Sequence, residues 1–352
     1  MAKDDWAIVV GIALYPELGN LDGPENDAQG FYDWLVAPDG GDVPPDNVAF
    51  FLSSRFPPAL AALRAEPGLA TLQVAFDELQ ELAKKNFKSG NGYRVGRRLY
   101  IFLSGHGCSP SSTDTALLAA NANRDRPGYH IIGRLYADTF LIANFFDEAV
   151  LFMDCCRENV QTPPNIPPYN KITGPDALDK ARCFYGFATK WSRLSRERKM
   201  ADGLVHGVFT TALLAGLKGA ACDPTDGRIT SASLGSYLYA NMKTFLSPAD
   251  LNDPEIPQEP DLDYGKNPQT PLVFATVAIP EFPVTINLPP ETAGKTIEIL
   301  DSKFNVVEST IAAPPQRKTK LKRGLYLATV LTTVLRKDFE VTGGTEEVNV
   351  SF

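Results

Sequence analysis

Cysteine and histidine are scarce in this sequence: its 352 residues include five cysteines and three histidines. Disulfide-held secreted domains have a dense, even set of cysteines. The cysteines here are scattered, odd in number and include an adjacent pair: Cys108, Cys155, Cys156, Cys183 and Cys222. A disulfide scaffold is therefore excluded, and we expect a reduced, cytoplasmic protein.

The sequence also lacks an excess of basic residues and any long apolar run. Its formal net charge is −8, whereas nucleic-acid binding needs clustered lysine and arginine to contact phosphates. No run approaches the ~20 apolar residues of a membrane-spanning helix, and no apolar stretch follows a basic N-terminus. We therefore predict neither nucleic acid nor a membrane as partner, and no signal peptide.

Strand and helix patterns alternate over residues 1–275. Apolar runs predict buried strands, and helical spacing of apolar residues predicts helices between them. The expected strands are 6–11, 48–52, 99–104, 150–154 and 183–188. The expected helices are 26–35 (capped by Asn26 and Asp27), 71–87, 137–146, 209–217 and 234–244. This alternation predicts an α/β fold, with a mostly parallel central sheet covered on both faces.

The pattern changes toward the C-terminus. Residues 252–271 are rich in Pro, Asp and Glu and have little periodicity, which indicates a linker or long connection. From residue 282 onward, short alternating runs separated by turn residues are typical of a small β-sandwich or barrel. We therefore predict two domains, an α/β domain over residues 1–275 and an all-β, sandwich-like domain over 276–352.

Two of the predicted strands end in reactive side chains. One run ends in His106 and Gly107, and the other ends in Asp154 followed closely by Cys156. Strand ends of an open α/β sheet meet at one crevice, so the imidazole and the thiol can form a base and a nucleophile. Cys156 would need a lowered pKa or an adjacent base, because the thiolate is the nucleophile. The N–H groups of Gly107 and Cys156 could stabilise an oxyanion.

These motifs resemble those of the caspase-like cysteine peptidases, and among them the bacterial metacaspase relatives (orthocaspases). The resemblance covers about residues 5–275 and depends on the runs 6–12, 23–28, 104–107, 154–157 and 207–210. The separation of 50 residues between His106 and Cys156 also matches caspases. The resemblance implies a caspase-like α/β/α sandwich, with Cys156 as nucleophile and His106 as base. Cys155 stands where serine is common in relatives, and Pro24 stands where cysteine is frequent.

The resemblance further implies that Asp27, Ser104 and Asp154 line the primary specificity (S1) pocket. Two carboxylates in one pocket repel each other unless a cation joins them, so the pocket should select Arg or Lys before the scissile bond. Asp27 could also be an ordinary helix cap, and the two roles are not exclusive. Asp154 at the end of a buried strand would be a costly lone carboxylate.

Metal sites are only weakly indicated. Four residues considered for zinc lack the paired spacing of structural sites: His106, Cys108, Cys155 and Cys156. Residues 223–227 resemble a calcium loop only in two carboxylates and a glycine. We predict no metal ligand and no required cofactor, and leave open whether calcium aids activation. His130 and His206 belong to no motif, which favours structural or surface roles.

Two segments bear on activation. Residues 158–179 are rich in Pro and Asn and follow the nucleophile, which predicts a mobile surface loop. Residues 190–199 carry five basic side chains, a run that by itself indicates a solvated face. In a protease that selects basic residues, this run and the loop around Lys171, Lys180 and Arg182 are candidate self-cleavage sites. The resemblance implies that such cleavage frees loops to form the pocket.

The sequence thus predicts a cytoplasmic cysteine endopeptidase that cleaves proteins or peptides after Arg or Lys. One variant is a zymogen that awaits an activating protease or regulatory partner, as in a bacterial defence or cell-death circuit. The alternative from another class is a catalytically idle scaffold of the same fold whose β-domain docks a partner. Intact His106 and Cys156 disfavour the scaffold.

Overall fold

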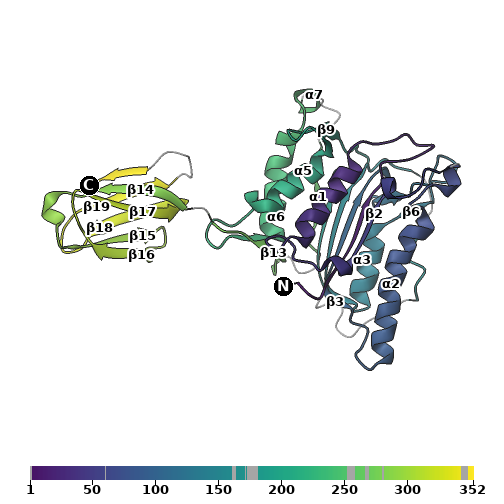
Figure 1. Cartoon of the computed structure of the whole chain (residues 1–352), viewed down its shortest axis with the longest axis horizontal. Helices are drawn as coiled ribbons and strands as arrows, with labels where there is room; N and C mark the ends of the chain where they lie inside the picture. Colours follow the sequence, from purple (N-terminus) through teal and green to yellow (C-terminus); the bar gives the residue numbers. More distant parts are fainter. Residues whose placement is uncertain are drawn as a thin grey trace. The chain divides into compact units, whose positions relative to one another are not determined.

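The computed structural model describes residues 2–59, 61–160, 164–170, 172, 181–251, 258–265, 269–279, 281–341 and 348–352. The chain divides into two compact units, which Figure 1 shows coloured along the sequence. The first unit consists of Met1–Cys222 and Arg228–Thr276, and the second of Asp223–Gly227 and Val277–Phe352.

A six-stranded sheet forms the centre of the first unit, in the order β12-β8-β7-β3-β1-β2. Its strands are β1 (Asp5–Gly11), β2 (Val48–Leu52), β3 (Gly96–Ser104), β7 (Phe146–Asp154), β8 (Arg182–Phe187) and β12 (Asp261–Asp263). All are parallel except β12, which joins β8 in the antiparallel direction. The predicted mostly parallel sheet is confirmed. Strand β12, however, lies in the segment predicted as a linker, because three residues are too few to give a periodic signal.

Helices cover both faces of this sheet, with α1, α5 and α6 on one face and α2 and α3 on the other (Figure 1). The helices are α1 (Pro24–Val36), α2 (Leu69–Lys88), α3 (Gly133–Ile142), α5 (Val208–Ala215), α6 (Ser231–Asn241) and α7 (Pro248–Leu251). On the α1 face, the Phe31 ring stacks on Phe102 with centroids 4.6 Å apart. On the other face, Phe140 belongs to a buried cluster with Ile101 and Leu151. Burial of both faces explains why the central strands are apolar without alternation. Within the described ranges, no helix combines the length and apolarity needed to cross a membrane.

Several helix boundaries differ from the sequence predictions by a few residues, and two of these differences have a clear local cause. α1 begins at Pro24 rather than after a cap at Asn26 and Asp27, because the fixed φ and missing N–H of proline suit the first helical position. Asp27 is therefore a buried residue inside the helix. α3 ends at Ile142 rather than at 146, because Asn144 adopts a left-handed conformation with φ of 57°.

Small sheets accompany the central one. One of them contains β4 (Gly107–Cys108), β5 (Ala116–Leu118) and β6 (His130–Ile131). Another contains β9 (Glu197–Lys199) and β10 (Val205–Gly207), and a third contains β11 (Arg228–Thr230) and β13 (Val273–Thr276). β4 starts directly after His106, and β10 ends at Gly207, directly before α5.

The second unit is built from two sheets that share one apolar core. One sheet contains β14 (Glu281–Asn287), β17 (Gln316–Lys322) and β20 (Val348–Ser351). The other contains β15 (Thr296–Asp301), β16 (Val306–Ile311), β18 (Gly324–Val330) and β19 (Arg336–Val341). Ile286 of the first sheet and Ile299 of the second belong to the same buried cluster. The predicted all-β, sandwich-like region is confirmed.

A row of charges lies at the amino ends of the central strands. Asp5, Arg98, Glu148 and Arg182 are cross-strand partners on β1, β3, β7 and β8. Glu148 forms ion pairs with Arg98, at 2.5 Å, and with Arg182. Asp5 pairs with Arg97. The side chains of Arg98 and Glu148 are only 2% and 3% exposed, so a shift in register would leave buried charges without partners.

We predict that Glu148→Gln destabilises the first unit by about 3–5 kcal/mol, because the buried Arg98 would lose its carboxylate partner. Tryptophan fluorescence during urea unfolding measures this selectively, since all three tryptophans lie in the first unit: Trp6, Trp34 and Trp191. The neighbouring surface pair of Asp147 and Arg94 provides the control. Asp147→Asn should change stability by about 0–1 kcal/mol, and equal losses in the two variants would contradict the prediction.

Candidate active site

The candidate site lies where β3 and β7 end. Ser104, the last residue of β3, is the cross-strand partner of Asp154, the last residue of β7. A Cβ placed on Gly107 would lie 2.4 Å from Cβ of Cys155 and 2.6 Å from the carbonyl oxygen of Cys156, so only glycine permits this approach. The histidine-bearing and cysteine-bearing segments therefore contact each other directly as they leave the sheet.

His106 is oriented by contacts on both its backbone and its ring. Its N–H donates to the hydroxyl of Tyr15 at 3.1 Å, and the two rings meet edge to face with centroids 4.7 Å apart. Nε2 of His106 lies 2.9 Å from the carbonyl oxygen of Gly19. Because a carbonyl oxygen only accepts, this contact assigns the ring proton to Nε2. Nδ1 then keeps a lone pair that can accept a proton.

The two adjacent cysteines have different surroundings. Cys155 is 1% exposed, and its thiol donates to the carbonyl oxygen of Leu103 at 3.6 Å. Cys156 is partly exposed, and its sulfur accepts the N–H of Ser195 at 3.4 Å. Successive side chains at a strand end point to opposite sides, so the two thiols cannot serve the same site. Cys155 belongs to the core, whereas Cys156 is partly exposed.

Burial raises the pKa of the Cys156 thiol above its ordinary value. The hydrogen bond from Ser195 lowers the pKa, whereas the nearby charges of Glu158 and Asp154 raise it. Without substrate, the thiol is therefore protonated near pH 7. A reactive thiolate at Cys156 would therefore need a base to take its proton.

The three residues predicted to line a pocket lie together. Asp27 is 1% exposed and accepts a hydrogen bond from the hydroxyl of Ser104 at 3.2 Å. A Cβ placed on Gly207 would lie 2.1 Å from one oxygen of Asp154 and 2.9 Å from one oxygen of Asp27. Those two carboxylate oxygens are thus within about 5 Å of each other, a range in which like charges strongly disfavour joint ionisation.

The N-terminal end of α5 supplies donors to both carboxylates. The N–H of Gly207 donates to Asp27 at 3.1 Å, and the N–H and hydroxyl of Thr210 donate to Asp154 at 3.0 and 2.8 Å. The hydroxyl of Ser195 adds a bond of 2.6 Å to Asp154. A helix N-terminus favours negative charge, yet burial outweighs this effect. The pKa of Asp27 is raised to about 7, and that of Asp154 is raised as well.

His206 is a neighbour of these two carboxylates that the sequence analysis did not assign to the site. Its Nδ1 lies 3.3 Å from Asp27, and its Nε2 lies 2.9 Å from Asp202. The hydrogen bond to Asp27 raises the pKa of His206. The sequence offered one hint of this placement, because His206 directly precedes the run 207–210 on which the family resemblance depends. That run itself includes no histidine.

Part of the basic run 190–199 lies beside Cys156. The N–H of Arg157 donates to the carbonyl oxygen of Arg193 at 2.9 Å, and the N–H of Ser192 donates to that of Arg157 at 3.0 Å. Together with the contact between Ser195 and Cys156, these bonds make residues 192–195 a wall of the site rather than a solvated face alone.

The predicted self-cleavage sites differ in their placement. Arg182 begins β8 and pairs with the buried Glu148, so it is a strand residue and not a loop residue. Lys171 and Lys180 lie outside the described residues. The predicted loop 158–179 also lies partly outside them.

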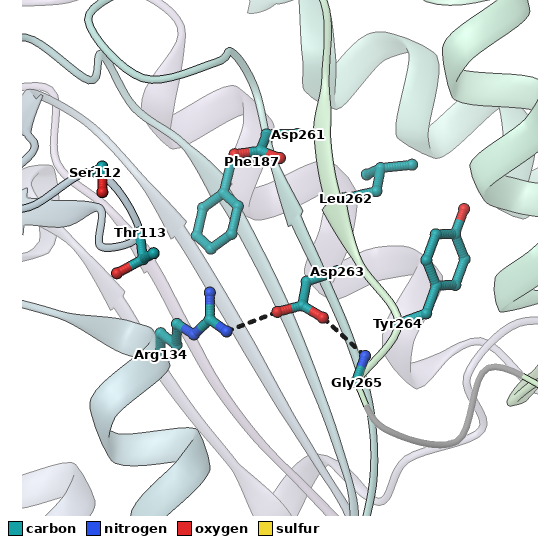
Figure 2. Close-up of a pocket in the computed structure, with 9 residues that line it drawn as sticks. All are labelled: Ser112, Thr113, Arg134, Phe187, Asp261, Leu262, Asp263, Tyr264 and Gly265. Atoms are coloured by element: carbon teal, nitrogen blue, oxygen red, sulfur yellow. Dashed lines mark hydrogen bonds and ion pairs between the residues drawn. The ribbon is translucent and has the colours of Figure 1, made fainter.

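Arg157 anchors the chain directly after Cys156. It is 0% exposed, donates to Asp261 of β12 at 2.5 Å and lies over the ring of Phe187 at 5.0 Å. A cavity of about 440 Å³ opens beside this anchor, and Figure 2 shows Arg134 and Asp263 paired within it. Its lining residues are Ser112, Thr113, Arg134, Phe187, Asp261, Leu262, Asp263, Tyr264 and Gly265. None of the predicted site residues belongs to this lining, so the cavity is separate from the candidate active site.

Within the part of the chain that the structure describes, no three His, Cys, Asp or Glu side chains are arranged to hold a metal ion. In the segment 223–227, the side chain of Asp223 accepts hydrogen bonds from the N–H and hydroxyl of Thr225 at 2.8 and 2.6 Å. This pattern is a local turn.

The first unit is an α/β/α domain with a thiol and an imidazole at neighbouring strand ends. The family profile of the caspase domain matches residues 4–237, and the chain belongs to this family of peptidases. A probable protease from a Desulfuromonadales bacterium is 25% identical over 328 residues, which cover 84% of this chain and 37% of the relative. The chain thus spans little more than a third of that protein's length.

Two solved structures are also similar. Caspase-1 from Spodoptera frugiperda has 14% identity and a TM-score of 0.48, over 78% of this chain and 91% of that chain. A protein from Geobacter sulfurreducens has 17% identity and a TM-score of 0.43, over 75% of this chain and 94% of that chain.

We predict that alkylation of Cys156 by iodoacetamide accelerates about tenfold per pH unit between pH 7 and 9, because only the thiolate reacts and the pKa is raised. Site-resolved mass spectrometry of the modified cysteine gives the rate, with the buried Cys155 as an internal control. A rate that stays constant from pH 6 to 9 would instead indicate a resident thiolate–imidazolium pair.

Proposed function

We propose that this chain is a cysteine endopeptidase that cleaves proteins or peptides after Arg or Lys. The observation that carries the proposal is the alignment of the two strand ends, with Ser104 opposite Asp154 and Gly107 packed on the backbone of Cys156. Membership of the caspase family supports peptidase activity. The buried carboxylates of Asp27 and Asp154 support selection of a basic side chain.

In the proposed reaction, Nδ1 of His106 accepts the thiol proton as Cys156 attacks the carbonyl carbon of the scissile bond. The N–H groups of Gly107 and Cys156 stabilise the negative oxygen of the tetrahedral intermediate. The intermediate collapses to a thioester, and the imidazolium returns its proton to the leaving amine. Water, deprotonated by His106, then hydrolyses the thioester and regenerates the thiol. This chemistry needs no cofactor or metal ion.

The S1 pocket is proposed to accept the guanidinium or ammonium group between Asp27 and Asp154. A planar guanidinium can bond a carboxylate through two N–H groups, which favours Arg in particular. An acidic side chain would add a third carboxylate to the pocket and be rejected. We include activation in the proposal. Self-cleavage within the basic run 190–199 would fit this specificity, and another protease or a partner could act instead.

The identity of the nucleophile is tested by two adjacent substitutions. Cys156→Ala should abolish cleavage of an Arg-containing peptide, because no other thiol faces the crevice. Cys155→Ala should retain much of the activity, because this thiol lies in the core. Initial rates with a fluorogenic peptide, checked by mass spectrometry of the cut site, give the comparison. Activity in the first variant with loss in the second would reverse the assignment.

The specificity is tested at Asp27. Asp27→Asn should reduce kcat/KM for Arg peptides by about 100-fold, equivalent to about 3 kcal/mol for breaking a buried charge pair. It should create no cleavage after Asp, because loss of a negative charge supplies no positive one. Asp33→Asn is the matched control, since Asp33 lies on the same helix and is exposed. Efficient wild-type cleavage after Asp, or equal activity of the two variants, would refute the pocket.

A further inference from the structure

His206 connects the buried pocket to an exposed carboxylate. Its ring lies between Asp27, at 3.3 Å from Nδ1, and Asp202, at 2.9 Å from Nε2. The side chains of Asp27, His206 and Asp202 are 1%, 15% and 53% exposed, so the three form a path from the pocket to solvent. A carboxylate only accepts hydrogen bonds, so an imidazole between two of them is held best when both nitrogens are protonated.

No other charged side chain for which a contact is described takes the place of Asp27 or Asp202 as a hydrogen-bond partner of His206. Arg198 is the cross-strand partner of His206, but its guanidinium donates to the carbonyl oxygens of Phe245 and Leu246. Asp27 and Asp202 contact the imidazole, and the charged groups on the neighbouring segments are Asp22, Asp154, Glu197, Arg198 and Lys199. The bonds to Asp27 and Asp202 raise the pKa of His206, and partial burial opposes them.

We propose that His206 is a specificity-determining residue, whose protonation sets the net charge of the pocket formed by Asp27 and Asp154. The inference rests on the proposed function of that pocket. A protonated imidazole is already a cation beside Asp27, where a substrate cation would compensate the same charge. A neutral imidazole leaves the pocket more negative. The proton and the substrate cation therefore compete, and each weakens the binding of the other by the same factor.

The direction of the effect follows from this competition. As pH falls, His206 gains its proton, and Asp27, with a pKa of about 7, becomes less ionised. Both changes make the pocket less negative, so affinity for a basic side chain falls with pH. The protonation of His106 and Cys156 changes the rate for every substrate, whereas that of His206 changes the affinity for a cation specifically.

The test measures competitive inhibition constants between about pH 5.5 and 9 for two small probes. N-acetylarginine amide carries one permanent positive charge, and N-acetylcitrulline amide is its uncharged counterpart. The Ki of the arginine probe should fall roughly tenfold or more as pH rises through the titration of His206, because a unit charge within a few ångströms is removed. The Ki of the citrulline probe, where measurable, should stay constant.

Asp202→Asn tests the assignment to His206. It removes a solvent-exposed hydrogen-bond partner that raises the pKa of His206, so the midpoint of the Ki profile should move to lower pH. In a His206→Gln background, the same substitution should leave the midpoint in place. A wild-type profile without a step, or a midpoint unmoved by Asp202→Asn, would overturn the inference. If the arginine probe fails to inhibit at any pH and Arg peptides are not preferred, the proposed S1 pocket itself is wrong.

Discussion

The row of charges at the amino ends of β1, β3, β7 and β8 is the constraint on which the candidate site depends. Its ion pairs hold the strands in one register, because any shift would leave buried charges unpaired. The same register, carried along β3 and β7, places Ser104 opposite Asp154. A slip of one residue would turn the side chains of a whole strand to the other face. The chemistry at one end of the sheet thus relies on electrostatics at the other.

The pocket combines two effects that oppose each other. Burial raises the pKa of both Asp27 and Asp154, and the nearby charge of Asp154 raises that of Asp27 further. The N-terminus of α5, with Thr210 and Ser195, offsets part of that cost through hydrogen bonds. A basic substrate side chain would supply the positive charge that the two carboxylates still lack. If protein groups compensated both carboxylates fully, the pocket would bind a cation with little preference.

Most of the fold was predictable because parallel strands buried on both faces appear as continuous apolar runs. Strand β12 was not predictable, because it is short and because its Asp261 is held by a hydrogen bond from Arg157, which is distant in sequence. The positions of Cys156 and His106 followed from strand ends and spacing, whereas the roles suggested for Asp27 and Asp154 came from the family resemblance. His206 could not be found in this way. Its contact with Asp27 arises only when β10 packs against α1, far along the chain.

In the proposed mechanism, Asp154 would link specificity to reactivity. Its negative charge is one of the causes that raise the pKa of the neighbouring Cys156 thiol. A substrate guanidinium held beside Asp154 would offset that charge and ease formation of the thiolate when the scissile bond is in place. An acidic side chain would do the reverse, in addition to its repulsion from the pocket. In the proposed mechanism, the thiol stays protonated and reacts slowly until substrate binds, and a cation held in the proposed pocket would also favour its activation.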